Sequence, residues 1–238
     1  MDFIEGEILC FDKPLKWTSF DVVRKIRHHL CQHLGVRKLK VGHAGTLDPL
    51  ATGVMVVCTG KATKRIDELQ AHVKEYVATL QLGATTPCFD LEKPIDQTYP
   101  TEHINETLVR EVLGKFVGRI EQVPPAFSAC KVDGHRAYDL ARKGREVELK
   151  PKILVIDEIE LLDFDQEKMQ ATIRVVCSKG TYIRALARDV GQALRSGAHL
   201  ISLRRTRVGD VKVEDCMKVE DFESWLASQE LRNNDTTT

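Results

Sequence analysis

One acidic side chain in this sequence lies in a loop whose composition suggests a fixed shape. Asp48 is part of "VGHAGTLDPLATG" (41–53), where glycines, small residues and a proline leave little helix or strand periodicity. A carboxylate held in this way can act as a nucleophile or a general base. The structural alternative is an aspartate that caps the turn before a proline, and the pattern alone favours it. However, the loop leads into an apolar strand, and this places Asp48 at the edge of a sheet, where catalytic side chains are common.

The signatures of other catalytic sites are incomplete. Gly60 and Lys61 follow an apolar run but lack the spacing and the Ser/Thr that a phosphate-binding P-loop needs. His29 and His33 are four residues apart without the glutamate of an HExxH zinc motif, so a helix-end or RNA-facing role is favoured. The seven cysteines are scattered and contain no CxxC pair, which indicates reduced and mostly buried thiols. We therefore expect no metal and no cofactor.

The bulk composition is typical of a globular protein. The chain has 238 residues, of which 42% are hydrophobic and 29% are charged. No run of about 18 apolar residues occurs, so no membrane span is expected. The N-terminus lacks the basic and apolar segments of a signal peptide. We expect a cytoplasmic protein.

Positive and negative charges balance overall but are separated along the chain. Residues 12–40 carry eight Lys/Arg and two acidic residues, and residues 179–212 carry the same numbers. Residues 154–170 and 214–230 each carry six acidic residues and one lysine. This separation is typical of a protein that binds a polyanion on one face, although chance clustering on solvated surfaces explains it equally well.

Hydrophobic periodicity predicts strands interleaved with helices. Thr18 or Ser19 would cap the first helix and Gly35 would end it. The predicted helices span 18–35, 61–71, 104–116 and 181–197, and the predicted strands span 6–14, 53–60, 74–83, 152–164, 168–180 and 199–211.

This order of elements indicates an α+β fold around a mixed or mainly antiparallel sheet that is flanked by helices. Residues 124–152 are basic and irregular, and we predict that they form a protruding insertion within a single domain over residues 1–228. Residues 229–238 have no apolar periodicity and are predicted to be a disordered tail.

A series of segments in unchanged order resembles the signatures of the TruB family, the tRNA pseudouridine synthases. "GHAGTLDPLATG" matches the family segment G-H-x-G-x-L-D-P-x-A-x-G around the catalytic aspartate. The resemblance covers about residues 8–212 and implies the pseudouridine synthase fold and a reaction without a cofactor. The other matching segments are "FDKPLKWTSFDVVRKIR", "KEYVATLQLGATTPCFD", "PPAFSACKVDGHRAYDLARKG", "CSKGTYIRALARDVG" and "GAHLISLRRTRVG".

The sequence departs from the family pattern in three places. Lys16 replaces the usual glycine of the N-terminal segment, and residues 86–90 read Thr-Pro-Cys-Phe-Asp where the family has an aspartate-rich turn. Bacterial members often carry a C-terminal PUA domain, and this sequence continues for only about 25 residues past "RRTRVGDV". We therefore expect the affinity for RNA to come from the catalytic domain.

The resemblance implies three catalytic residues. Asp48 matches the catalytic aspartate, and Arg184 matches the arginine that pairs with it. Tyr76 matches the tyrosine that stacks on the uracil and is a candidate for handling the C5 proton. The structural alternatives are a surface arginine on a helix for Arg184 and a core tyrosine on an alternating strand for Tyr76.

The resemblance also implies residues that bind the RNA. Tyr182 and Leu203 would line the base pocket, and His43 would fill the gap that the flipped nucleotide leaves in the stack. Basic residues would hold the RNA backbone and so contribute affinity rather than base identity. These residues are Arg136, Arg142, Lys143 and Arg145 in the insertion, and Arg204, Arg205 and Arg207 in the last strand.

The implied activity is the isomerisation of uridine 55 in the T loop of tRNA, in which the glycosidic bond breaks, the base rotates and a C5–C1′ bond forms. The alternative is a tRNA-binding folding chaperone that acts independently of catalysis. A third possibility, the catalytic subunit of a guide-RNA particle, is disfavoured. We expect tRNA, through its T arm, as the partner of a monomer, with no membrane and no obligatory protein partner.

Overall fold

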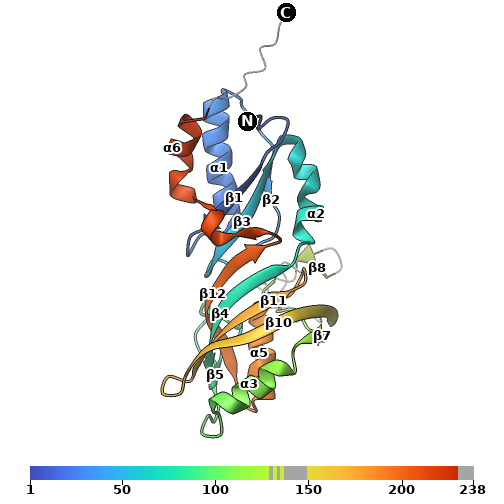
Figure 1. Ribbon diagram of the computed structural model, residues 1–238, viewed down its shortest axis with the longest axis vertical. Coiled ribbons are helices and arrows are strands. Elements are labelled where there is room, and N and C mark those ends of the chain that lie inside the picture. Colours follow the sequence, from blue (N-terminus) through green and yellow to red (C-terminus); the bar gives the residue numbers. More distant parts are fainter. Residues whose placement is uncertain (129–130, 133–134, 137–148, 230–238) are drawn as a thin grey trace, which may run out of the picture. The chain divides into compact units, whose positions relative to one another are not determined.

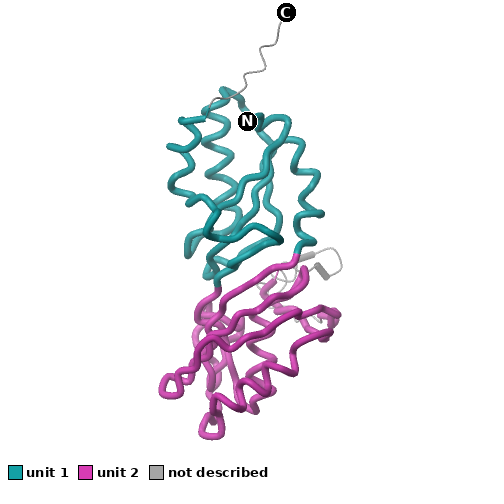
Figure 2. Tube along the Cα trace, in the orientation of Figure 1, with its two compact units in different colours: residues 1–72, 204–238 teal, residues 73–203 magenta. Residues whose placement is uncertain are grey.

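The computed structural model describes residues 1–128, 131–132, 135–136 and 149–229 (Figure 1). The chain forms two compact units, of which the first contains residues 1–72 and 204–238 and the second contains residues 73–203 (Figure 2). The strand β12 (Ala198–Val208) contributes to both units, because the division falls within it. The single domain over 1–228, with its insertion at 124–152, stays a prediction, and residues 230–238 of the predicted tail lie outside the described residues.

The first unit is built on a mixed sheet in the order β14–β1–β3–β12, with β2 on β3 and β13 on β12. The β1–β3, β2–β3 and β12–β13 pairs are antiparallel, and the β1–β14 pair is parallel. The strands are β1 (Ile8–Lys13), β2 (Val41–His43), β3 (Ala51–Thr59), β13 (Val211–Lys212) and β14 (Met217–Lys218).

Both faces of β3 are covered, and this explains why its sequence is almost continuously apolar. Met55 and Val57 belong to a core cluster with residues of α1 (Ser19–Leu34) and α6 (Phe222–Ala227). The alternate residues of β3 pack with Leu69 of α2 (Ile66–Gln70) in a second cluster. Figure 1 shows α1 and α6 side by side along the strands of this unit.

The first helix begins and ends where the sequence predicts. Thr18 is the N-cap of α1 and forms a capping box with Asp21, in which each side chain accepts a hydrogen bond from the other residue's backbone N–H. Gly35 ends the helix in the left-handed conformation, with φ of 65°. Val22, Ile26 and Leu30 form its buried face.

Two regions of the first unit differ from the prediction. The helix expected at 61–71 is a 3₁₀ turn, η1 (Gly60–Arg65), followed by the short α2. Residues 213–228, for which the sequence predicts no element, form η2 (Val213–Asp215), β14, η3 (Val219–Asp221) and α6. These elements are too short for periodicity to reveal them, and their apolar residues are buried only through contacts with distant strands.

The second unit contains a sheet in the order β12–β4–β11–β10–β7, in which the β4–β11, β11–β10 and β10–β7 pairs are antiparallel. The central strand β4 alternates between buried and half-buried residues, as predicted. The elements of this unit are β4 (Lys74–Leu82), β5 (Ala84–Thr85), β6 (Gln97–Thr98), α3 (Glu106–Gly114), β7 (Gly118–Gln122), β8 (Lys131–Val132), β9 (His135–Arg136), β10 (Lys152–Asp165), β11 (Gln170–Cys177) and α5 (Ile183–Ala193).

The sheet of the second unit carries helices and also an ion-pair cluster. The helix α5 contacts β4, and α3 contacts β10. On β11, Arg174 bridges neighbouring strands through Glu75, Glu158 and Glu160, at 3.0, 2.5 and 3.0 Å. The α+β fold with a mainly antiparallel sheet is thus confirmed. None of the described helices has the length and apolar character needed to cross a membrane.

Replacing Gly53 should destabilise the first unit far more than replacing Gly35. Both residues have positive φ, 109° and 65°, but a Cβ on Gly53 would lie 2.1 Å from the carbonyl oxygen of Arg205, whereas one on Gly35 would meet nothing within 4 Å. We expect Gly35→Ala to cost about 1 kcal/mol for its left-handed backbone and Gly53→Ala to cost several-fold more. Urea unfolding of the two variants measures this difference, and equal losses would contradict the close approach of β3 and β12.

Candidate active site

Asp48 lies in the loop between β2 and β3, in the first unit, and is half-buried. The base of the loop is closed by the backbone N–H of Ala44, which donates to the carbonyl of Val56 at 2.9 Å. Within the loop, the N–H of Ala51 donates to the carbonyl of Asp48 at 3.0 Å. The backbone on which the carboxylate is mounted is therefore a hydrogen-bonded turn.

The start of α1 holds both residues that flank Asp48. The buried hydroxyl of Ser19 accepts a hydrogen bond from the N–H of Leu47 at 2.9 Å and donates to the carbonyl of the same residue at 3.1 Å. The N–H of Lys16 donates to the carbonyl of Pro49 at 2.7 Å. Because each contact joins residues about 30 positions apart in sequence, the location of Asp48 depends on the tertiary structure.

Arg205 of β12 holds the same loop through hydrogen bonds to its carbonyls. Its side chain is 2% exposed. Its guanidinium donates to the carbonyls of Val54, Gly45 and Thr46 at 2.8, 3.1 and 3.4 Å. The buried guanidinium thus binds loop carbonyls in this structure, and the expected contact of Arg205 with RNA stays a prediction.

The neighbouring arginine on β12 has a different environment. The side chain of Arg204 is 40% exposed and pairs with Asp12 at 2.8 Å, and it also donates to the hydroxyl of Thr52 at 3.1 Å. Its contact with RNA stays a prediction.

Lys13 is a cation near Asp48 that the sequence analysis did not single out. It is fully buried at the end of β1, and its Nζ donates to the carbonyls of Pro14 and Trp17 at 3.0 and 2.5 Å. Burial lowers the pKa of Lys13 from 10.5 to about 8, and the negative charge of Asp48 opposes this shift. The first unit therefore supplies a buried positive charge that interacts with Asp48. The available signal was "DKP", where a lysine precedes the proline that ends an apolar strand.

Tyr76 lies on β4 of the second unit and is 7% exposed. In the β4–β11 register it is opposite Val175, and its strand neighbours on the same face are the buried Lys74 and Ala78. The position of Tyr76 is thus fixed by the centre of an antiparallel sheet. Its catalytic role stays a prediction.

Arg184 lies in the first turn of α5 and is not the surface arginine of the structural alternative. It is 5% exposed, and its guanidinium donates to the carbonyls of Cys88 and Phe127 at 3.1 and 2.9 Å. The turn that supplies the first carbonyl is closed by the hydroxyl of Thr86, which donates to the carbonyl of Asp90 at 2.6 Å, and by the thiol of Cys88, which donates to the carboxylate of Asp90 at 3.0 Å.

The turn at 86–90, which departs from the family sequence, therefore has a defined geometry. Phe89 takes a left-handed φ of 66°. The guanidinium of Arg188 lies 5.0 Å from the centre of the Phe89 ring. Burial is the main cause of the raised pKa of the Cys88 thiol.

Tyr182, just before α5, is positioned by a side chain that the sequence analysis missed. Gln122 of β7 is 1% exposed, and its amide both accepts a hydrogen bond from the N–H of Tyr182 at 2.9 Å and donates to the carbonyl of Tyr182 at 3.2 Å. No sequence signal marked Gln122, because this pairing joins residues 60 positions apart.

The predicted site residues are divided between the two units. Asp48 and His43 belong to the first unit; Tyr76, Tyr182, Arg184 and Leu203 belong to the second. The pairing of Asp48 with Arg184 stays a prediction. Of the insertion, Arg142, Lys143 and Arg145 lie outside the described residues, and Arg136 is described only by its backbone pairing with Lys131.

No group of three or more His, Cys, Asp and Glu side chains in the described part of the chain is placed to hold a metal ion.

Two family matches together cover most of the chain. Residues 32–183 match the TruB family pseudouridylate synthase (N terminal domain), and residues 184–236 match the tRNA pseudouridylate synthase B C-terminal domain. The chain belongs to the TruB family.

Curated relatives in this family match nearly the full length of the chain. The tRNA pseudouridine synthase B of Phocaeicola vulgatus is 72% identical over 97% of both chains. The protein of the same name from Bacteroides fragilis is 68% identical over 99% of this chain and 100% of its own. That of Flavobacterium johnsoniae is 51% identical over 94% and 98%.

Solved structures of more distant proteins share the fold. A chain in the crystal structure of a Cbf5-Nop10-Gar1 complex is 30% identical, with a TM-score of 0.70 over 94% of this chain and 55% of that chain. A chain in the structure of an H/ACA RNP bound to a substrate RNA is 28% identical, with a TM-score of 0.66 over 94% and 54%.

The lowered pKa of Lys13 predicts a pH dependence of stability for this TruB family member. Between about pH 8 and 10.5 the folded chain has lost the Lys13 proton while the unfolded chain keeps it. The free energy of unfolding should therefore rise with pH in this window, relative to Lys13→Met, by up to about 3 kcal/mol. Urea unfolding of both proteins from pH 7 to 10.5 measures this.

Asp48→Asn provides the control, because removing the charge that raises the pKa of Lys13 in the folded chain should extend the window to lower pH and leave its upper bound unchanged. Parallel stability curves for the wild type and Lys13→Met would contradict the assignment.

Proposed function

We propose that this chain converts uridine 55 in the T loop of tRNA to pseudouridine. The proposal depends chiefly on the 72% identity, over 97% of both chains, to a relative named tRNA pseudouridine synthase B. The geometry of the Asp48 loop supports it, since the loop carries one carboxylate on a backbone that is anchored at both flanking residues.

The reaction breaks the glycosidic bond, rotates the detached uracil and joins its C5 to C1′ of the ribose. It needs one group of controlled charge and a pocket that retains the free base. Asp48 is that group. Attack on C1′, addition to C6 and deprotonation of the sugar are all chemically open to it.

An ionised carboxylate in a closed site requires a compensating cation. We assign this role to Arg184, as the family resemblance implies. The two carbonyls that bind its guanidinium hold its orientation before the substrate arrives. Lys13 adds a buried positive charge that interacts with Asp48 from within its own unit.

The remaining site residues handle the base and the RNA. Tyr76 stacks on the uracil and takes part in transfer of the C5 proton, while Tyr182 and Leu203 line the pocket. His43 replaces the everted nucleotide in the stack and so offsets part of the cost of flipping, which is about a few kcal/mol. Basic residues bind the RNA backbone, namely Arg204 together with Arg136, Arg142, Lys143 and Arg145 of the insertion.

Asp48→Asn should abolish turnover while keeping the fold and tRNA binding. The amide has nearly the shape of the carboxylate but is neither a nucleophile nor a base, so we expect a loss of at least about 10³-fold. The measurement is mapping of pseudouridine in an unmodified tRNA transcript incubated with the purified protein alone. Activity at one T-loop position without another component supports the stand-alone enzyme; appreciable turnover by the variant would contradict the role of Asp48.

Tyr76→Phe should lose product formation without losing affinity for tRNA. The ring that packs and stacks is kept, and only the hydroxyl that can take part in proton transfer is removed. Single-turnover rates and tRNA affinity, measured side by side, separate these effects. If Tyr76→Phe forms product at the wild-type rate, the hydroxyl of Tyr76 has no catalytic role and the residue contributes only packing.

A further inference from the structure

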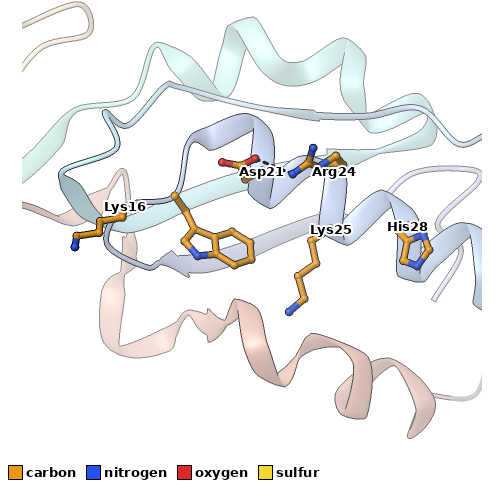
Figure 3. A pocket seen from close by; sticks show the side chains of 6 residues that line it. Lys16, Asp21, Arg24, Lys25 and His28 are labelled. Atoms are coloured by element: carbon orange, nitrogen blue, oxygen red, sulfur yellow. Dashed lines mark hydrogen bonds and ion pairs between the residues drawn. The ribbon is translucent and has the colours of Figure 1, made fainter. Parts of the chain in front are cut away.

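A pocket of about 510 Å³ lies in the first unit, along α1 and the turn before it (Figure 3). The site residues assigned above do not line it. Its lining combines basic side chains with one aromatic ring: Lys16, Trp17, Asp21, Arg24, Lys25 and His28.

The pocket has a net positive charge, because its one carboxylate is already engaged. The carboxylate of Asp21 accepts hydrogen bonds from the backbone and hydroxyl of Thr18 at 3.0 and 2.6 Å and pairs with Arg24 at 3.0 Å. Lys16 and Lys25 form no ion pair with a carboxylate among residues 1–128 and 149–229. Three cations thus share one anion, and the two lysines can receive a phosphate group.

Trp17 gives the pocket an aromatic wall. Its side chain packs against the core cluster of α1, β1 and α6, and its backbone carbonyl accepts a hydrogen bond from the buried Nζ of Lys13. The Nζ of Lys25 lies 5.7 Å from the centre of the ring. This ammonium lies over the ring, so a base that stacks on Trp17 would displace it from the ring face toward the phosphate of the same nucleotide.

The backbone of Lys16 has a conformation that is unfavourable for a residue with a side chain. Its φ is 68°, a left-handed conformation that glycine adopts without strain and that other L residues adopt only at a cost in free energy. Its side chain is exposed at the pocket, and its N–H donates to the carbonyl of Pro49, next to Asp48. A lysine here therefore costs backbone energy and supplies a charge beside the loop of the proposed catalytic residue.

We infer that this pocket binds a nucleotide of the RNA substrate other than the target uridine, with its base against Trp17 and its phosphate on Lys25. Lys16, whose side chain points away from Lys25 (Figure 3), binds a neighbouring phosphate of the same strand. The inference rests on the proposed function, since it takes tRNA as the ligand. It adds a contact on α1 to those of the insertion and β12.

The first test is Lys16→Gly, with Arg195→Gly as the matched control. Arg195 is also an exposed cation with positive φ, 53°, but it lies in the second unit. Both changes remove one charge and relieve the same backbone strain, so the melting temperature should hold or rise in each. Affinity for an unmodified tRNA transcript is measured against salt concentration in Asp48→Asn, which prevents turnover.

We expect only Lys16→Gly to weaken tRNA binding and to reduce the slope of log K against log salt by about 1. Equal slopes for Lys16→Gly and Arg195→Gly would overturn the inference. Failure of the proposed function would be seen separately, as absence of pseudouridine in the wild-type reaction.

The second test observes the base directly. The chain has 2 tryptophans, so Trp225→Phe leaves Trp17 as the only one. In this variant, combined with Asp48→Asn, saturating tRNA should quench tryptophan fluorescence, and Arg24→Gln with Lys25→Gln should weaken the quenching titration about tenfold. Arg110→Gln on α3 with Lys115→Gln directly after it is the matched control and should leave the titration unchanged.

Two results would overturn the assignment. The first is full tRNA binding, measured by filter retention, with no change in the Trp17 signal. The second is quenching by adenosine monophosphate but not by tRNA, which would indicate a site for a free nucleotide.

Discussion

The geometry of the proposed site depends on the hydrogen bonds between the start of α1 and the loop of Asp48. Ser19 binds both backbone groups of Leu47, and the N–H of Lys16 binds the carbonyl of Pro49. Leu47 and Pro49 are the two neighbours of Asp48, so these bonds restrain the backbone that carries its carboxylate. A catalytic group gains from such positioning because the orientation is established when the protein folds rather than in each turnover.

Buried cations complete this arrangement in the first unit. The guanidinium of Arg205 replaces the water that would otherwise solvate the loop carbonyls, while Lys13 adds a positive charge that Asp48 stabilises. Burying a charge is costly unless it is paired or hydrogen-bonded, and both side chains meet that condition. The loop and the strand ends around it therefore form one network, and the same network extends through Lys16 and Trp17 to the basic pocket on α1.

Much of the fold was predictable because it follows from local chemistry. Three features depend only on residues close together in sequence, and the structure has all of them: the capping box at Thr18, the left-handed end of α1 at Gly35 and the alternation of β4. The segment after β12 was not predictable in this way. Its helix α6 spans only Phe222–Ala227 and is buried through residues that lie far away in sequence.

The sequence by itself determined the identity of the catalytic candidate, since the residue types and spacing around Asp48 match the family motif for the catalytic aspartate. Only the tertiary structure decided which basic side chains bind the Asp48 loop. The sequence pattern gives Arg204 and Arg205 equal standing, yet one pairs with Asp12 at the surface and the other is buried on the loop carbonyls. The physical reason is that adjacent residues of a strand point to opposite faces, and the face that is buried depends on what packs against it.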